Sequence, residues 1–398
     1  MDPVTDALPN IATLLQSDYI DADAPDYRLH ARGCLLFNTR RSGYNVKRFE
    51  LNYAPFVNSL TPPSVKKAWV SHSGADSNGV SYFGHKAQRN TIVTAMKSAI
   101  NSSVDIREDQ FQFNLLCCPG YPELMIDMIS LNNDRKQTGF VIGDSPMTLD
   151  SSTTSISRWV TNANKAIGDG KDGLTSHSPY LAVYYPSGMA TNIDGTLVAV
   201  PSSHMALRTM IFSDNVSYPW FAPAGARRGV VDNASAIGYV DITSNNVFRS
   251  IGVTQSLRDV LYENSVNPLT VIPGAGILVY GQKTRQSYSS SLDRINVARL
   301  ICYLRIVLDT VARPFVFEPN DTITRNQVKT AFQQVFNDLI AKRGITDYLV
   351  VCDTTNNTSD RIDRNELWVD IAIEPTRAIE FVYIPIRLKN PGDIAKGV

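Results

Sequence analysis

Residues 366–388 place the strictest limit on how this chain can fold. The first part of this segment alternates apolar with other residues at a period of two, which predicts a strand with one apolar face. The alternating apolar positions are Leu367, Val369, Ile371 and Ile373. Turn-forming residues follow at 375–377, and residues 378–388 predict a second strand that is apolar at nearly every position.

The second predicted strand contains Pro385. Because proline has no N–H to donate to a β-ladder, such a strand belongs at a sheet edge or beside a bulge. An apolar edge strand near a chain end promotes aggregation unless another strand pairs with it. Two possibilities follow: the protein covers this edge itself, or it uses the edge to pair with another chain.

Length and charge narrow the class of protein. A chain of 398 residues has room for two or three domains. Its 38 basic and 38 acidic residues give a formal net charge of zero, which argues against a nucleic-acid or anionic-membrane partner and suits self-association. No apolar run approaches the ~20 residues of a membrane span, and the N-terminus lacks the pattern of a signal peptide.

The five cysteines show no metal-binding or disulfide pattern. No CxxC or Cys/His spacing suggests zinc, and the adjacent Cys117 and Cys118 follow an apolar run, as small buried thiols do. The sequence therefore predicts a protein made in a reducing cytoplasm, with no metal site.

The chain is expected to have four parts. Residues 1–30 predict a flexible acidic arm, in which Asp18, Asp21, Asp23 and Asp26 lack the glycine and the closing glutamate of a calcium loop. Residues 31–100 predict a β-rich portion with hairpin turns and a helix over 87–100. An α/β middle part over 101–266 and an inner domain over 267–398 complete the chain.

Strands and helices alternate through the middle part. The predicted strands are 112–118, 139–143, 180–185 and 196–200, and the predicted helices are 121–133, 151–167 and 201–212. Alternation at this spacing is typical of βαβ units, so we expect an α/β domain with a mainly parallel sheet.

The last part predicts a helix-on-sheet α+β domain. Apolar residues recur at helical spacing over 292–312 and 322–343. Asp321 or Thr322 is a candidate N-cap of the second helix, and Gly344 a candidate C′ residue. A strand over 348–353 and the terminal hairpin follow.

The sequence carries no convincing catalytic motif. It has no phosphate-binding GxxxxGK[ST] loop and no GxSxG nucleophile elbow, and the glycines at 274, 276 and 281 straddle a strand instead of opening a helix. His204 lies near a predicted strand-to-helix junction without a matching nucleophile. We therefore predict no catalytic, cofactor-binding or metal-binding residue and no cofactor, and keep an α/β hydrolase-like enzyme using His204 as the alternative from another class.

Several short segments together resemble one family. They are 293–300 (DRINVARL), 315–321 (FVFEPND) with Arg325, 350–353 (VVCD) with Asn356 and Asn357, and 368–375 (WVDIAIEP) with Glu380 and Phe381. Upstream lie 218–225 (YPWFAPAG), Arg228-Gly229, Asn267-Pro268 and 281–284 (GQKT). In order and spacing this set resembles the contractile tail sheath proteins of myophages.

The resemblance implies a structural protein without enzymatic activity. Sheath subunits stack as hexameric rings around the tail tube and contract to drive the tube through the host cell envelope for genome ejection. The implied partners are other copies of the chain, the tail tube protein, and the baseplate and tail terminator proteins; the implied location is the virion tail, assembled in the host cytoplasm. The sheath of a phage-derived contractile injection system is the alternative within this class.

The resemblance also implies site residues. Strand exchange between subunits assigns inter-subunit pairing to Val382, Ile384 and Ile386, with the arm of residues 1–30 as partner. Contact with the tube assigns docking to the basic residues Arg325, Lys329, Lys342 and Arg343, although a solvated helix face also explains them. Most family members are longer, so the chain is either a compact sheath protein or an N-terminally shortened fragment.

Overall fold

The computed structural model describes residues 85–108, 111–165, 170–241 and 247–380, which form two compact units divided between Phe317 and Glu318. The predicted arm and the predicted hairpins before residue 85 lie outside the described residues. The sequence placed a domain boundary between residues 266 and 267, whereas residues 267–317 belong to the first unit in the structure.

The first unit is built on a five-stranded sheet of order β1-β2-β3-β8-β9. Its strands are β1 (Leu115–Cys117), β2 (Phe140–Asp144), β3 (Leu181–Tyr185), β8 (Asn267–Ile272) and β9 (Gly276–Val279). The first four run parallel and β9 runs antiparallel to β8, which confirms the predicted mainly parallel sheet. Every residue of β2 and β3 is buried, as expected for parallel strands covered on both faces.

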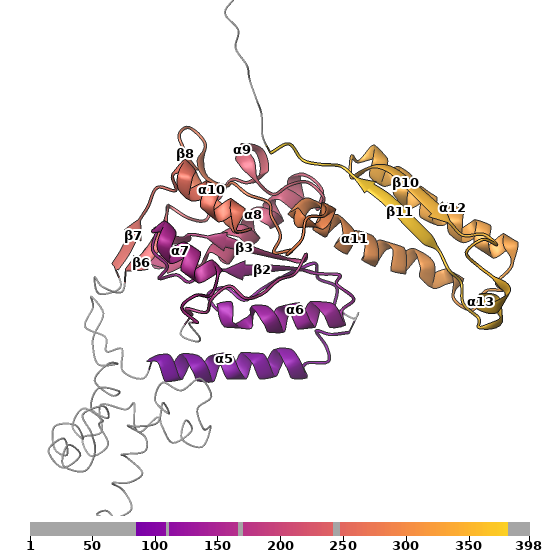
Figure 1. The fold of residues 1–398 in the computed structure, drawn as a ribbon, viewed down its shortest axis with the longest axis horizontal. Coiled ribbons are helices and arrows are strands. Elements are labelled where there is room, and N and C mark those ends of the chain that lie inside the picture. Colours follow the sequence, from indigo (N-terminus) through magenta and orange to yellow (C-terminus); the bar gives the residue numbers. More distant parts are fainter. Residues whose placement is uncertain (1–84, 109–110, 166–169, 242–246, 381–398) are drawn as a thin grey trace, which may run out of the picture. The chain divides into compact units, whose positions relative to one another are not determined.

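Helices cover this sheet (Figure 1). They are α5 (His85–Ser102), α6 (Met125–Asp134) after the 3₁₀ turn η1 (Pro122–Leu124), α7 (Thr153–Val160), α8 (Ser202–Val216), the short α9 (Gly225–Arg228), α10 (Gln255–Glu263) and α11 (Ile295–Ala312). Both α6 and α8 pack on β2, from opposite sides of the sheet in Figure 1. No helix of the described segments is long and apolar enough to cross a membrane.

Two of the predicted middle elements differ in the structure. The predicted strand at 196–200 forms, as β5 (Leu197–Val200), but it pairs antiparallel with β4 (Ser187–Thr191). Only five residues separate the two strands, too few for the crossover of ten or more residues that a parallel pair needs. The predicted helix at 151–167 stops at Val160, because Asn162 adopts a left-handed φ of 51°.

The β5–β4 hairpin belongs to a second, antiparallel sheet of order β5-β4-β6-β7. Its other strands are β6 (Ala236–Asp241) and β7 (Val247–Ser250), neither of which was predicted. The region between β3 and β8 therefore holds an antiparallel sheet in addition to α8 and α10.

The second unit packs one long helix on a pair of strands. Its elements are α12 (Thr322–Ala341), β10 (Ile345–Val351), the short α13 (Ser359–Asp363) and β11 (Asp370–Pro375). Strands β10 and β11 pair antiparallel, with a register shift between Ile345 and Asp347. Two long helices before a strand pair were predicted here, and residues beyond Glu380 lie outside the described chain.

The two ends of α12 are capped by different devices. Asp321 Oδ1 accepts the Thr324 N–H at 2.8 Å, which confirms Asp321 as the N-cap. At the other end the Arg343 N–H donates to Ile340 O and the Gly344 N–H to Leu339 O, at 2.9 and 2.8 Å. These are the two bonds of a Schellman motif, so the left-handed C′ residue is Arg343 (φ 62°), and Gly344 lies one position later than predicted.

Candidate functional site

The sheet of the second unit is unfinished within the described chain. Strands β10 and β11 pair only with each other there, so each has one outer edge whose N–H and C=O groups have no described strand beside them. Helix α12 buries Val328, Phe332 and Phe336, and the Phe336 ring stacks on Tyr348 of β10 with 5.1 Å between centroids. One face of the strand pair is thus closed and its two edges are not.

The strand register separates two faces. Val350 and Tyr348 lie opposite Ile371 and Ile373, on the face that holds the Phe336 contact. Ile371 and Ile373 therefore share one face, as predicted, whereas Leu367 and Val369 of the predicted strand precede β11, which begins at Asp370. The opposite face carries the pair Leu349 and Ala372, where the Leu349 side chain is 60% exposed. Leu349 therefore lies exposed on the face of the strand pair opposite to the Phe336 contact.

An asparagine pair fixes the loop that leads into β11. Asn356 Nδ2 lies 2.8 Å from Val351 O and 3.1 Å from Trp368 O, and Asn357 Oδ1 accepts the Trp368 N–H at 2.8 Å. The Arg361 guanidinium lies 3.9 Å from the centroid of the Trp368 ring. Both asparagines are buried. Their side-chain amides satisfy backbone groups of Val351, in the last pair of the β10–β11 ladder, and of Trp368, which precedes β11.

The four predicted docking residues fall into two pairs on α12. Arg325 and Lys329 lie one helical turn apart near its start, whereas Lys342 and Arg343 lie at its C-terminal end. At 1.5 Å per residue, about 20 Å of helix separates Lys329 of the first pair from Lys342 of the second. The structure therefore presents two separate basic positions and does not bring the four residues together.

Burial distinguishes Arg325 from the other three. It is 7% exposed, and its Nη1 has no hydrogen-bond partner among the described residues. Positions 325, 328, 332, 336 and 339 follow one helical stripe, and all five are buried. That periodicity was readable in the sequence and could have placed Arg325 in the core-facing stripe.

The other three basic residues reach solvent. Lys329 is half-buried and forms no ion pair with any described residue. Lys342 pairs with Asp338 at 2.7 Å, and Arg343 is exposed in its left-handed conformation. Burial raises the pKa of the Cys352 thiol while the nearby Arg325 and Lys329 charges lower it, which places both cations beside the end of β10.

Val382, Ile384 and Ile386, the residues predicted for strand pairing, lie outside the described residues, as does the arm of residues 1–30. Their assignment stays a prediction. The outer edges of β10 and β11 are the groups with which such strands would pair.

A buried carboxylate occupies the position where α/β enzymes often hold their active sites. Asp144 ends β2, and its carboxylate accepts the Gly120 N–H at 2.7 Å and the Ser203 N–H at 2.6 Å. The Ser203 hydroxyl donates to the same carboxylate at 2.7 Å, and Ser202 Oγ lies 3.1 Å from it. Burial raises the pKa of Asp144, and these donors oppose that shift. The cluster fastens the start of α8 to β2.

His204 does not complete this cluster. Its side chain is exposed on α8, and none of the described hydrogen bonds connects it to Asp144, Ser202 or Ser203. Burial raises the pKa of the neighbouring Cys117 thiol to about 12, which keeps it protonated and unreactive at neutral pH. In the part of the chain that the structure describes, no hydrogen bond joins His204 to a nucleophile, as the hydrolase alternative would require.

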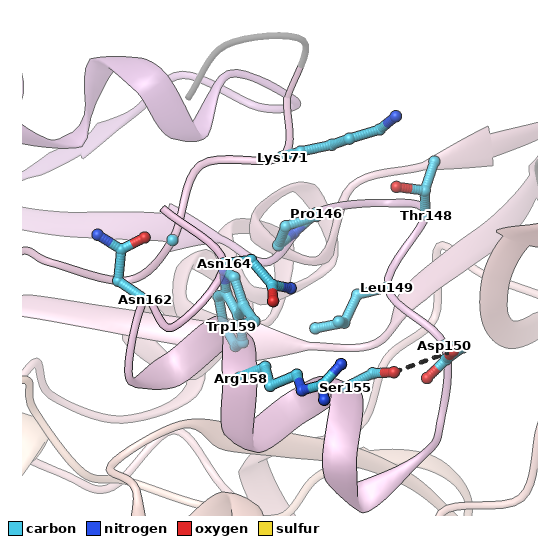
Figure 2. Close-up of a pocket in the computed structure, with 11 residues that line it drawn as sticks. Pro146, Thr148, Leu149, Asp150, Ser155, Arg158, Trp159, Asn162, Asn164 and Lys171 are labelled. Atoms are coloured by element: carbon cyan, nitrogen blue, oxygen red, sulfur yellow. Dashed lines mark hydrogen bonds between the residues drawn. The ribbon is translucent and has the colours of Figure 1, made fainter. Parts of the chain in front are cut away.

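A cavity of about 240 Å³ lies beside α7. Figure 2 shows Asp150 and Ser155 joined by a hydrogen bond of 3.1 Å beside Arg158, with the Lys171 side chain pointing away from Trp159. Histidine and cysteine are absent from its lining, and no group of ligating side chains in the described segments could hold a metal ion.

Known proteins resemble part of the chain. Residues 287–389 match the phage tail sheath C-terminal domain family. The tail sheath protein of Enterobacteria phage T4 is 38% identical over 170 residues, which is 43% of this chain and 24% of that protein. The tail sheath protein of Vibrio phage KVP40 is 33% identical over 171 residues, again 43% of this chain and 24% of the relative. The chain's match thus spans about a quarter of the length of these curated relatives.

Solved structures share the fold over a longer stretch. The sheath complex of PVC, an extracellular contractile injection system, in its contracted state superposes with a TM-score of 0.57 at 18% identity, covering 74% of this chain and 75% of that chain. The contracted baseplate of the anti-feeding prophage gives 0.57 at 19% identity, covering 74% and 76%. Over about three-quarters of its length the chain thus shares the fold of these solved structures. Its residues 287–389 match the phage tail sheath C-terminal domain family.

Proposed function

We propose that this protein is the structural subunit of a contractile tail sheath. Copies would stack as hexameric rings around a tail tube and contract to drive that tube through the host cell envelope. The proposal is supported above all by the two-stranded sheet of the second unit, which lies within residues 287–389, the part that matches the sheath C-terminal domain family.

Strand addition between copies would complete that sheet. The apolar segment with Val382, Ile384 and Ile386 from one copy, and the arm of residues 1–30 from another, would pair with the outer edges of β10 and β11. Main-chain bonds give such a contact its affinity, and the alternating side chains give it register.

A link of this kind suits a polymer that changes its twist and rise. Pairing by backbone bonds survives rotation of the subunits provided that the connecting segments bend. A head-to-tail contact that does not close on itself also generates a helical stack. The free energy of contraction would come from a larger interface per subunit in the contracted state, without a cofactor.

Contact with the tube protein would use the basic surface of α12. Lys329, Lys342 and Arg343 reach solvent, whereas Arg325 lies beneath that surface, one turn before Lys329. Because the charges of two partners are complementary across an interface, the tube surface facing α12 would be acidic. Such charges at the rim of an interface steer association and set register more than they raise affinity. Baseplate and tail terminator proteins would bound the stack at its two ends.

The sheath of a phage-derived contractile injection system is the second candidate. The fold similarity to PVC and anti-feeding prophage structures favours it, and the sequence similarity to the T4 and KVP40 proteins favours the phage tail. Both candidates assign the same roles to the residues of the second unit.

Truncation after Arg377 tests the strand-exchange mechanism. The full chain is expected to form rings or tubes in negative-stain electron microscopy, whereas the truncated chain stays unpolymerised with its circular dichroism spectrum largely retained. A finer variant, Ile384→Pro, removes one ladder N–H, and Ile384→Val is its matched control with the N–H intact. Normal tubes from the truncated chain would rule out strand exchange.

A further inference from the structure

A second cavity, of about 350 Å³, lies in the first unit between the C-terminal end of α6, the start of β1 and the second half of α11. It is independent of the open sheet in the second unit. Its lining combines several basic side chains with apolar ones. The charged and aromatic residues of the lining are Phe113, Arg135, Lys136, Arg305, Asp309 and Arg313. Four of these six are basic and one is acidic, a local surplus of three positive charges.

The guanidinium of Arg305 is held in place by neutral groups. Its Nη1 donates to Lys136 O at 3.2 Å, to Gln137 O at 3.0 Å and to Gln137 Oε1 at 2.8 Å. The same group lies 5.1 Å from the centroid of the Tyr180 ring. Carbonyl oxygens orient the guanidinium but do not neutralise its positive charge. No carboxylate of the described residues forms an ion pair with Arg305 or with Lys136.

The one acidic side chain of the cavity is already engaged. Asp309 Oδ2 accepts from Arg313 Nε at 3.0 Å and from Arg313 Nη2 at 2.8 Å. Arg135 is 4% exposed, donates to Ile106 O, Glu108 O and Phe111 O, and lies 4.0 Å from the centroid of the Phe113 ring. The cavity is therefore a rigid, positively charged pocket with an aromatic wall, which suits an acidic peptide carrying an apolar side chain.

The chain contains one segment of that chemistry. Residues 1–27 hold six aspartates and neither lysine nor arginine, and four of the six aspartates lie within residues 18–26, beside Tyr19 and Ile20. We propose that residues 18–26 dock in this cavity of their own chain. Their carboxylates would face Lys136 and Arg305, and Tyr19 or Ile20 would pack on Phe113.

Tethering favours the segment of the same chain over that of a second copy. A linked segment meets its site at an effective concentration of about millimolar, far above the concentration of other copies in dilute solution. Residues 27–84 lie between the segment and α5, and at ~3.3 Å per residue they are long enough to reach any part of a domain of this size.

The docking itself does not depend on the sheath function. Its consequence does: if the arm exchanges strands between copies, docking of residues 18–26 would hold the arm on its own subunit before assembly. Residues 1–17, which are more apolar, would remain the part available for pairing with a neighbour.

Site-specific photo-cross-linking in the full-length chain tests the docking directly. Tyr19 is replaced by p-benzoylphenylalanine, the dilute protein is irradiated, and cross-linked peptides are mapped by mass spectrometry. Mixing ¹⁴N- and ¹⁵N-labelled protein separates cross-links within one chain from those between chains. We expect intrachain cross-links to residues 111–138 or 305–313. Substituting all four aspartates of 18–26 by asparagine should lower their yield about tenfold, since each exposed charge pair contributes up to ~1 kcal/mol.

Matched variants guard against loss of fold and non-specific charge effects. The four-aspartate variant changes no residue of the first unit's core, and Asp2→Asn with Asp6→Asn removes arm charge outside the segment and should leave the yield unchanged. Lys136→Gln with Arg305→Gln should lower the yield, whereas Arg158→Gln, at the cavity of Figure 2, should not. Cross-links mainly between chains, cross-links elsewhere, or an unchanged yield in the four-aspartate variant would each overturn the proposal.

Discussion

The two units of this protein use their sheets in opposite ways. In the first unit, β2 and β3 lie inside a five-stranded sheet and bury every residue. In the second unit, β11 pairs with a single strand, and each of its residues is half-buried or exposed. A sheet covered on both faces is stable by itself, whereas two strands with one helix gain most from added strands. If the proposed strand exchange is correct, the first unit folds independently and the second is completed by assembly.

Matched leucine substitutions give the largest expected difference between the units. Leu181 in β3 is fully buried, so Leu181→Ala should lower the free energy of unfolding by about 3 kcal/mol. Leu349 in β10 is 60% exposed, so Leu349→Ala should cost less than ~1 kcal/mol in the unassembled chain. Urea unfolding of both variants measures the two values.

The effect on assembly should be larger for Leu349→Ala than its effect on the free energy of unfolding. If the face around Leu349 is buried between copies, Leu349→Ala should reduce the yield of rings or tubes at a fixed protein concentration. Leu349→Met, which keeps the apolar area, is the control. Equal and large losses of stability in the Leu181 and Leu349 variants would erase the contrast between the two units.

An acid-sensitive contact should distinguish the first unit further. Burial alone would raise the pKa of Glu123, but hydrogen bonds from Arg89 Nε at 2.7 Å and the Gly170 N–H at 2.7 Å, with the Arg89 charge, hold it below its ordinary value of 4.5. Because the folded-state pKa is the lower one, this contribution is present above pH 4.5 and is lost as the pH falls through the folded-state value.

Glu123→Gln should therefore cost about 2 kcal/mol at pH 7 and flatten the decline in stability below pH ~5. Chemical denaturation of the variant and the parent chain between pH 3 and pH 7 measures both effects. The exposed Asp259→Asn is the control and should leave the slope unchanged. The same steep slope in the Glu123 variant would show that other carboxylates cause it.

The smallest expected effect is a gain at the end of α12. Arg343 occupies the left-handed C′ position with φ 62°, a conformation that costs a non-glycine residue about 1 kcal/mol. Arg343→Gly should stabilise the second unit by about that amount, while Arg343→Ala should not. Thermal unfolding of the two variants decides this, and a loss of stability in the glycine variant would contradict the Schellman assignment. Weaker binding of the tube protein by both variants would support the docking proposal.

Much of the first unit was predictable because its strands are short apolar runs separated by helical patterns. The runs at 139–143 and 180–185 predicted β2 and β3. A strand buried on both faces is apolar at nearly every position, so its sequence shows directly that it lies inside the sheet. Strands β4 and β6 escaped prediction because Gly188, Gly238 and small polar residues interrupt their apolar pattern. The orientation of β5 depends on the short turn before it, which the alternation of elements does not reveal.

The candidate site was predictable in its chemistry and less so in its geometry. The alternation predicted a strand with Ile371 and Ile373 on one face but started it too early, since β11 begins at Asp370. The helical period predicted α12. Composition alone grouped Arg325 with three cations that reach solvent, although its place on the 325–328–332 stripe indicates burial. That the basic residues form two separate pairs became clear only once α12 was seen to hold them apart. A single sequence can indicate an apolar edge strand, but it does not reveal which strand of another chain pairs with it.

A high-resolution electron cryomicroscopy map of the assembled protein tests the central claim most directly. The account predicts that the sheet of β10 and β11 gains at least one strand from another copy, with backbone hydrogen bonds along an outer edge of β10 or β11. A map in which each sheet contains only strands of its own chain, with no segment passing between subunits, would contradict it.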